Sequence, residues 1–405
     1  MAVLISKTDA LDGADHTKDG QAAETVQSAR THPEQLDRAS WSDLFAQVRN
    51  SIIRRPGFIR WASRFWLTRP IARKRTSELF NLATGFVYTK ILTTVVDLKL
   101  CERVADGPRS VSDLASSLDM PEQSLLTVLK GAEALALVRK TAGDKWGLDE
   151  LGAALLANPG VIAMVEHHKV LYRDLEDPLA LLRSPSSPSE LSNYWAYVQS
   201  ADPNDQSVSE YSALMASSQD FISQMVVDAY PFERHTRFVD LGGGEGRFAQ
   251  AVVDETPGIT AQIFDLPPVA RRANERIRQI GASGRMAALG GNFFTDSLPG
   301  EVDLVTLVRV LHDHDDDKVL DLLANIRSAV RPATTVMIAE PLAETPGAEK
   351  AGAAYFGFYL MAMRSGRPRT KAELSAFLTK TGFSEPVEHS TSLPLLARVL
   401  SARAK

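Results

Sequence analysis

The spacing of hydrophobic positions changes near residue 231. Beyond this point short apolar runs alternate with amphipathic segments; the runs are RFVDLG, AQIFDLP, RMAALGGNF, DLVTLVRVLHD and TTVMIAEP. This alternation is typical of a parallel sheet whose two faces are covered by helices. The ending VEHSTSLPLLARVLSAR holds two more strand-like runs that close the sheet. We therefore predict an α/β domain over residues 231–405.

Residues 77–230 show helical spacing instead. The apolar positions that recur at this spacing are Leu79, Phe80, Leu82, Ala83, Phe86, Val87 and Ile91. Farther along, SVSDLASSLDMPEQSLLTVLKGAEALALVRK followed by GDKWGL predicts a helix, a turn, a second helix and a hairpin, as in a winged helix. Ser110 or Ser112 can cap the first of these helices, and Pro121 suits the first turn of the second.

Winged helices often bind DNA, so a ligand-responsive regulator is an alternative of another class. The second helix offers one lysine and no arginine to a phosphate or a base edge. The net charge of −5 and the pI of about 6 give no global electrostatic support for binding nucleic acid. We expect no nucleic-acid partner.

The N-terminal segment divides into two parts of contrasting charge. Residues 1–42 are polar, acidic and poor in aromatics, which predicts a disordered extension. Residues 43–76 form a basic aromatic arm, and between Leu44 and Ser77 there is no Asp or Glu. Its basic and aromatic residues are Arg49, Arg54, Arg55, Phe58, Arg60, Trp61, Arg64, Phe65, Trp66, Arg69, Arg73, Lys74 and Arg75. Two compatible interpretations stay open: an arm packed on a partner subunit, or a helix lying on an anionic membrane surface over residues 44–77.

The amino-acid composition indicates in which cellular compartment the protein works. Cys101 is the only cysteine, so no disulfide forms within one chain and no cysteine cluster holds zinc. The N-terminus lacks the apolar core of a signal peptide, and no run of about 18 apolar residues predicts a membrane span. We expect a cytoplasmic protein that is soluble or peripherally attached to the cytoplasmic membrane.

A glycine-rich loop follows the first strand of the α/β domain. Glycines at 242, 244 and 246 let a backbone approach a ligand closely, with the next helix N-terminus facing that ligand. A dinucleotide fingerprint places its third glycine at 247, where this chain has Arg247. Asp240-x-Gly242-x-Gly244-x-Gly246 instead resembles the first motif of S-adenosylmethionine methyltransferases, and Asp240 suits the cofactor's amino group.

Two later segments extend the cofactor prediction. Asp265 ends the second strand, where a carboxylate can accept hydrogen bonds from both ribose hydroxyls, or can cap the next helix. In GGNFF, Phe293 can stack on adenine and Asn292 can bind its edge, although both can equally be loop packing. We also assign Arg309 to the cofactor site.

His312 is the predicted general base. It follows the fourth strand, whose C-terminal end faces the ligand crevice of an open α/β sheet. An imidazole titrates near neutral pH and can take the proton that an acceptor hydroxyl loses. Glu340 ends the fifth strand and can hold the His312 ring. His314, among four aspartates, is expected to be solvated or to cap the next helix, and we expect no metal site.

Together these motifs resemble the caffeate-type O-methyltransferases. DLGGGEG, FDLP, GNFF, LHDHDDD and IAEP occur in that family's order. The resemblance implies a Rossmann-like class I methyltransferase domain with a seven-stranded, mostly parallel sheet, preceded by a helical winged-helix dimerisation domain. It also implies contact of Met215 with the cofactor and a homodimer. Asn292 replaces the usual Asp, His314 a frequent Trp, and Pro368 a second Glu that many members place beside the histidine.

The N-terminal half has a narrower resemblance. RWASRFWLTRPIARKR, ELFNLATGFVYTKIL and HHKVLYRDLEDPLALLR are similar to bacterial acyclic-carotenoid O-methyltransferases, which methylate a C-1 tertiary hydroxyl. This resemblance implies a carotenoid acceptor; an aromatic polyketide, a phenol or a tetrapyrrole is the alternative. The candidate acceptor pocket comprises His168, Tyr172, Phe358 and Met361, although ordinary core packing explains the same helical spacing.

Overall fold

The computed structural model describes residues 41–194, 219 and 221–405. It forms two compact units, residues 1–83 and 84–405, and each is described by itself. The predicted boundaries at residues 42, 76 and 230 remain predictions. Residues 1–40 of the predicted extension, and Met215, lie outside the described residues.

The first unit is helical. Its helices are α1 (Trp41–Ile53), α2 (Pro56–Arg64) and the first half of α3 (Arg69–Asp97). No residue of α1 is buried, and only Ala62 of α2 is. By length and composition alone α3 is long and apolar enough to cross a membrane. The sequence analysis predicted no such segment. Thr93, Val95 and Val96 near its end are buried, and the two valines belong to the hydrophobic core that follows.

A winged helix begins the second unit. Its elements are α4 (Leu100–Ala105), β1 (Arg109–Ser110), α5 (Val111–Leu118), α6 (Glu122–Ala134), β2 (Val138–Thr141), η1 (Ala142–Asp144) and β3 (Lys145–Leu148). The strands form a small antiparallel sheet in the order β1-β3-β2. Ser110 caps α5 by accepting a hydrogen bond from the Asp113 backbone N–H. The predicted helix, turn, helix and hairpin are confirmed.

Short helices connect this region to the α/β domain. They are α7 (Glu150–Leu156), α8 (Pro159–Asp174), α9 (Pro178–Arg183), α10 (Glu190–Tyr194), a helix over 221–229 and η2 (Phe232–Arg234). Helix α8 contacts α10 and, from the far end of the chain, α16 (Phe356–Met363). Leu171 of α8 and Leu360 and Met363 of α16 share one hydrophobic cluster. Packing therefore brings two helices that are remote in sequence to one place.

The α/β domain contains the predicted seven-stranded sheet. Its strands are β4 (Arg237–Leu241), β5 (Thr260–Asp265), β6 (Met286–Gly290), β7 (Leu304–Val308), β8 (Thr335–Glu340), β9 (Val387–His389) and β10 (Arg398–Arg403). The order is β6-β5-β4-β7-β8-β10-β9, parallel from β6 to β8, with β10 antiparallel to β8 and β9. The last two runs close the sheet as the sequence predicts.

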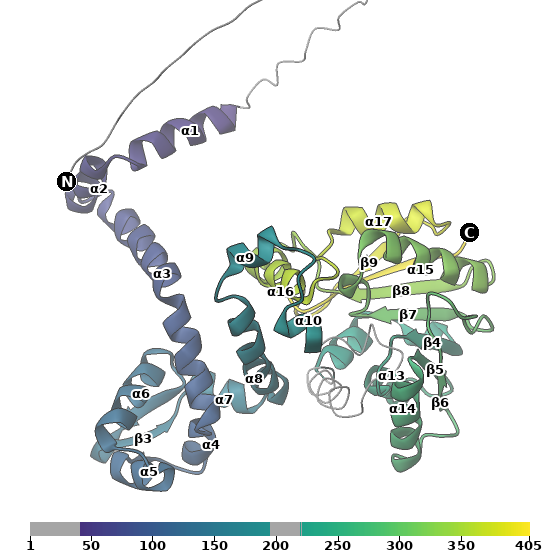
Figure 1. Ribbon diagram of the computed structural model, residues 1–405, viewed down its shortest axis with the longest axis horizontal. Coiled ribbons are helices and arrows are strands. Elements are labelled where there is room, and N and C mark those ends of the chain that lie inside the picture. The colour runs from purple at the N-terminus through teal and green to yellow at the C-terminus, as the bar shows by residue number, and fades with distance from the viewer. Residues whose placement is uncertain (1–40, 195–218, 220) are drawn as a thin grey trace, which may run out of the picture. The chain divides into compact units, whose positions relative to one another are not determined.

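Helices cover both faces of this sheet (Figure 1). They are α13 (Arg247–Glu255), α14 (Pro267–Gln279), α15 (Asp316–Ala329) and α17 (Lys371–Lys380). Two short helices, η3 (Leu311–Asp313) and η4 (Lys350–Tyr355), lie in the connections that follow β7 and β8. Successive side chains of a strand point to opposite faces. Phe238 accordingly joins the cluster with α13 and α14, whereas Val239 joins the cluster with α15 and α17. The chain order β4-β5-β6 on one side and β7-β8 on the other places a topological switch point beside β4, where ligands bind in such sheets.

Candidate active site

The glycine loop forms a tight turn between β4 and α13. Gly242, Gly244 and Gly246 have φ of 68°, 57° and 78°, a region that favours glycine. Asp265 holds the turn in place: its two carboxylate oxygens accept hydrogen bonds from the Gly244 and Leu266 backbone N–H groups, at 2.8 and 2.7 Å. Burial raises the pKa of Asp265, and these hydrogen bonds oppose that effect. Asp265 thus fixes the conformation of the glycine loop. It also lies at the strand end where the sequence predicts a carboxylate that binds the ribose hydroxyls.

Asp240 lies beneath the loop with one oxygen unused. Its Oδ1 accepts a hydrogen bond from the Thr306 hydroxyl at 2.7 Å, whereas Oδ2 is buried and has no hydrogen-bond partner among the described residues. Burial, with repulsion from Asp265, raises the pKa of Asp240 to about 7 despite the Thr306 hydrogen bond. A buried carboxylate oxygen without a donor is costly. An ammonium group of a ligand would relieve both the burial and the unmet hydrogen bond.

We expect Gly243→Ala to weaken binding of S-adenosylmethionine at least about tenfold, because the added Cβ would stand 2.4 Å from Asp240 Oδ2 and displace this carboxylate. Isothermal titration calorimetry measures the effect. Gly284→Ala, which places its Cβ in open space, is the matched control and should leave the affinity unchanged. Equal affinity in both variants would show that Asp240 does not face the ligand.

The loop after β6 contains the predicted adenine residues. The Asn292 side-chain oxygen accepts a hydrogen bond from the Phe294 backbone N–H at 2.9 Å, so that oxygen organises the loop. The half-buried Phe293 ring borders the glycine loop, 3.7 Å from where a Cβ on Gly242 would lie. The prediction that His314 is solvated or caps the next helix is wrong, because Asp315 is the N-cap of α15. The His314 ring packs edge-on against Phe293 and Phe294, and burial lowers its pKa to about 4.

His312 and Glu340 meet as predicted. The Glu340 Oε2 accepts a hydrogen bond from His312 Nδ1 at 2.5 Å, and its Oε1 accepts from the Val310 and Leu311 backbone N–H groups. Both side chains are buried. These three donors satisfy both carboxylate oxygens and fix the ring orientation. Because Nδ1 carries the proton toward Glu340, Nε2 of the neutral ring is free to accept one.

Asp313 supplies a second carboxylate, which the sequence analysis missed. Its Oδ1 lies 3.2 Å from His312 Nε2 and forms an ion pair with the ring when the ring is protonated. The second charge beside the ring therefore comes from the residue after the histidine. Burial alone would lower the pKa of His312, but Asp313 and Glu340 together raise it above the ordinary value of 6.5. The pKa of Asp313 is itself raised by burial to about 6.

These charges predict a pH dependence. Only the neutral imidazole accepts a proton, so kcat/KM should rise with pH through an apparent pKa above 6.5. Asp313→Asn removes a charge that raises the His312 pKa, and the rise should therefore shift to lower pH. The exposed Asp317→Asn should leave the profile in place. A pH–rate profile of the three proteins measures this, and an upward shift in Asp313→Asn would contradict the assignment.

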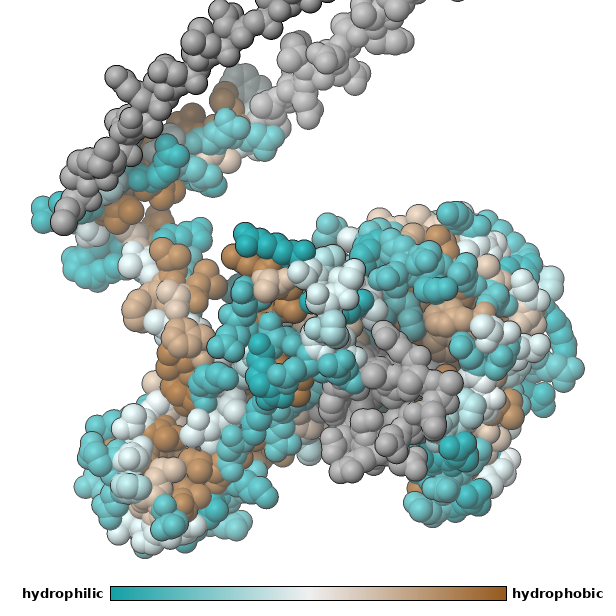
Figure 2. Space-filling model, in the orientation of Figure 1, coloured by the Kyte–Doolittle hydropathy of each residue, from teal (hydrophilic) through white to brown (hydrophobic). Residues whose placement is uncertain are grey.

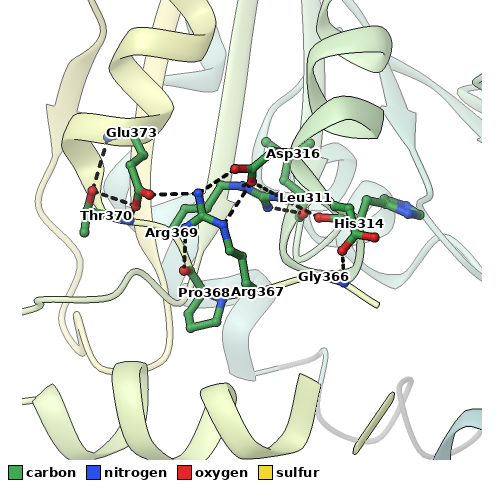
Figure 3. A network of polar contacts seen from close by, with 10 residues as sticks. Leu311, His314, Asp316, Gly366, Arg367, Pro368, Arg369, Thr370 and Glu373 are labelled. Atoms are coloured by element: carbon green, nitrogen blue, oxygen red, sulfur yellow. Dashed lines mark hydrogen bonds and ion pairs between the residues drawn. The ribbon is translucent and has the colours of Figure 1, made fainter. Parts of the chain in front are cut away.

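The segment 366–370 fixes the loop that carries His312 (Figure 3). The Arg369 side chain, 2% exposed, donates hydrogen bonds to the Leu311 and His314 carbonyls, both at 2.6 Å. It shares Asp316 with Arg367, which also pairs with Glu373 at the start of α17. Asp316 therefore serves as an anchor, as does Asp315, which accepts a hydrogen bond from the Gly366 backbone N–H. Arg369 holds carbonyls on both sides of the predicted base.

The candidate acceptor residues separate into two groups. The His168 Nε2 and Tyr355 hydroxyl lie 2.9 Å apart, and the Tyr172 and His168 rings are neighbours. Burial lowers the pKa of His168. Met361 packs in the cluster between α8 and α16, whereas Phe358 is 45% exposed.

The ring next to the predicted base belongs to Phe356, whose centroid lies 5.9 Å from that of His312. Helical spacing alone did not distinguish Phe356 from Phe358.

Comparison with known proteins identifies the chain's family. A family model described as an O-methyltransferase domain matches residues 189–384. The chain is 38% identical over 328 residues to the demethylspheroidene O-methyltransferase of Cereibacter sphaeroides, covering 80% of this chain and 86% of that protein. The chain belongs to the O-methyltransferase family.

Further similarities agree with this assignment. The demethylspheroidene O-methyltransferase of Rhodobacter capsulatus is 34% identical, with 82% of this chain and 83% of that protein covered. Human N-acetylserotonin methyltransferase, solved with S-adenosylmethionine, superposes with a TM-score of 0.70 at 22% identity, over 82% of this chain and 97% of that one. This O-methyltransferase is therefore an S-adenosylmethionine-dependent enzyme.

The residues of this O-methyltransferase fit the cofactor. The unpartnered Asp240 Oδ2 suits an ammonium group, and the glycine turn leaves room for close approach. Arg309, at the end of β7, has a left-handed backbone with φ of 57° and a buried Nε without a hydrogen-bond partner among the described residues. A strained backbone and a buried Nε without a hydrogen-bond partner are typical of binding positions, and a guanidinium suits a carboxylate.

Proposed function

We propose that this O-methyltransferase methylates the C-1 tertiary hydroxyl of an acyclic carotenoid of the demethylspheroidene or hydroxyneurosporene type. The similarity to two demethylspheroidene O-methyltransferases, at 38% and 34% identity over about four fifths of the chain, is the observation that carries the proposal. The aromatic and apolar surroundings of α8 and α16 support it, because a polyene offers few groups for polar recognition.

The proposed chemistry uses the His312 centre. S-Adenosylmethionine supplies a methyl group on a sulfonium, so an oxygen–carbon bond forms as the sulfur–carbon bond breaks. His312 Nε2 takes the hydroxyl proton, and Glu340 and Asp313 stabilise the resulting imidazolium. We propose that Asp240, Gly242, Gly244, Gly246, Asp265, Asn292, Phe293, Arg309 and Met215 hold the cofactor. Tyr355 and Phe356 join His168, Tyr172, Phe358 and Met361 on the acceptor side.

We also propose a homodimer that works in the cytoplasm, in peripheral contact with the membrane where its acceptor dissolves. The apolar residues of α3 support the dimer: Leu79, Phe80 and Leu82 are 70%, 62% and 72% exposed. Several exposed apolar side chains along one helix are typical of a surface that is buried against a partner subunit.

Incubation with a labelled methyl donor tests the acceptor. We expect label to enter a detergent-solubilised 1-hydroxy acyclic carotenoid with kcat/KM at least about tenfold above that for phenols, aromatic polyketides or tetrapyrroles. The same carotenoid without its hydroxyl is the control and should remain unlabelled. Faster labelling of a ring hydroxyl would overturn the carotenoid proposal and leave the O-methyltransferase assignment intact.

A further inference from the structure

Residues 41–76 form a surface that the methyl-transfer site does not use, here termed the basic aromatic surface. All nine of its basic side chains are exposed, and no acidic residue lies between Leu44 and Ser77. Within the described part of the chain only Arg75 of these nine forms an ion pair, with Glu78. Among the residues that the structure describes, the surface therefore carries a dense positive charge that is largely uncompensated.

Apolar residues share this surface and keep to one side of each helix. In α1, Trp41, Leu44, Phe45, Val48 and Ile52 recur every three or four residues and are 39–87% exposed. In α2, the Phe58 and Trp61 rings are neighbours, and Phe65, just beyond the helix, stacks on Trp61 at 5.2 Å. Arg60 and Arg64 lie on the opposite side of α2 by helical spacing.

Figure 2 shows hydrophobic residues gathered over α2 and the adjoining turns of α3, interspersed with hydrophilic ones. Trp66, beside α2, is 73% exposed. Tryptophan and phenylalanine beside arginines are typical of helices that lie in the interface of a bilayer, with rings at the acyl boundary and cations among the phosphates.

Charge distinguishes the possible occupants of this surface. In a twofold-symmetric contact, a second copy of this chain would bring the same nine cations against this surface, and the like charges would repel each other. The cores of protein interfaces are depleted of charge, whereas here cations are interspersed with the apolar residues along residues 49–75. An anionic lipid surface satisfies the rings and the cations together.

We propose that the basic aromatic surface docks this enzyme on anionic phospholipid, with Trp41, Trp61, Phe65 and Trp66 entering the interface and the arginines contacting phosphates. The purpose of the contact, access to a lipid-dissolved acceptor, rests on the proposed function. The contact itself rests only on the charge and exposure of residues 41–76.

Vesicle co-sedimentation of the full chain tests the docking. We expect strong binding to vesicles of phosphatidylcholine with about 30% phosphatidylglycerol, at least tenfold weaker binding to phosphatidylcholine alone, and loss of binding at high salt. The variant with Arg49, Arg54, Arg55, Arg60 and Arg64 changed to Gln should bind at least tenfold more weakly, as should Trp61→Ser with Trp66→Ser. The matched control changes five exposed arginines of the second unit to Gln: Arg139, Arg183, Arg271, Arg278 and Arg331.

The outcomes separate this proposal from the others. Wild-type binding by the five-arginine variant, or equal binding to both vesicle types, would overturn it. If the wild type binds no vesicles and these variants lose the dimer in sedimentation velocity, the surface belongs to a partner subunit. That result would also overturn the proposal. Methylation of detergent-solubilised acceptor should be unchanged in all variants. A failure of the proposed function would appear as no carotenoid methylation while vesicle binding persists.

Discussion

Replacement of His312 by alanine is expected to lower kcat by about 10²–10⁴-fold, because the acceptor hydroxyl then loses its proton without a positioned base. The affinity for S-adenosylmethionine, measured by calorimetry, should stay within about threefold, since His312 faces Asp313 and Glu340 rather than the glycine loop. Steady-state kinetics with the labelled methyl donor measures kcat.

His389→Ala is the matched control. His389 is half-buried and bonds to the Ser401 hydroxyl at the far edge of the sheet, so kcat should change by less than about twofold. Glu340→Gln should lower kcat substantially alone and add little in the His312→Ala background, because Glu340 acts through the ring it holds. A His312→Ala enzyme that keeps more than a tenth of its activity would contradict the assignment of the base.

Arg369→Met is expected to give the second largest effect. It leaves the Leu311 and His314 carbonyls without their donor, at a cost of about 1–3 kcal/mol of folding free energy each. The loop carrying His312 then loses its anchor on both sides, and we expect kcat to fall at least about tenfold with little change in the acceptor KM. Denaturant unfolding and steady-state kinetics measure the two effects.

Two further variants separate positioning from stability. Arg367→Met removes a side chain that is 40% exposed and should cost at most about 1 kcal/mol, with kcat within about threefold of the wild type. Arg369→Lys keeps the charge and should recover part of both losses, although an ammonium cannot reach both carbonyls as the guanidinium fork does. A folded Arg369→Met enzyme with normal kcat would show that Arg369 does not position His312.

Residue types and their local spacing in the sequence were sufficient to predict the strands, the glycine turn and the candidate base. Alternating apolar runs required a sheet covered on both faces, and glycines at 242, 244 and 246 required the positive φ angles that the turn has. His312 lies shortly after the end of β7 and Glu340 is the last residue of β8, and parallel neighbouring strands bring such ends together. The second carboxylate was adjacent in the His312–Asp313 pair but was sought at Pro368, because the resemblance to the family pointed there.

Contacts between distant segments were decided by the tertiary structure. Arg369 reaches carbonyls more than 50 residues earlier, His314 enters a pocket of phenylalanines from another loop, and Phe356 rather than Phe358 reaches His312. Such contacts depend on how α16, α17 and η3 pack, and no local spacing encodes them. The sequence by itself determined the elements and the kind of chemistry, because these follow from short-range periodicity and residue type. Only the tertiary structure decided which charges and rings surround the base, because packing sets these distances.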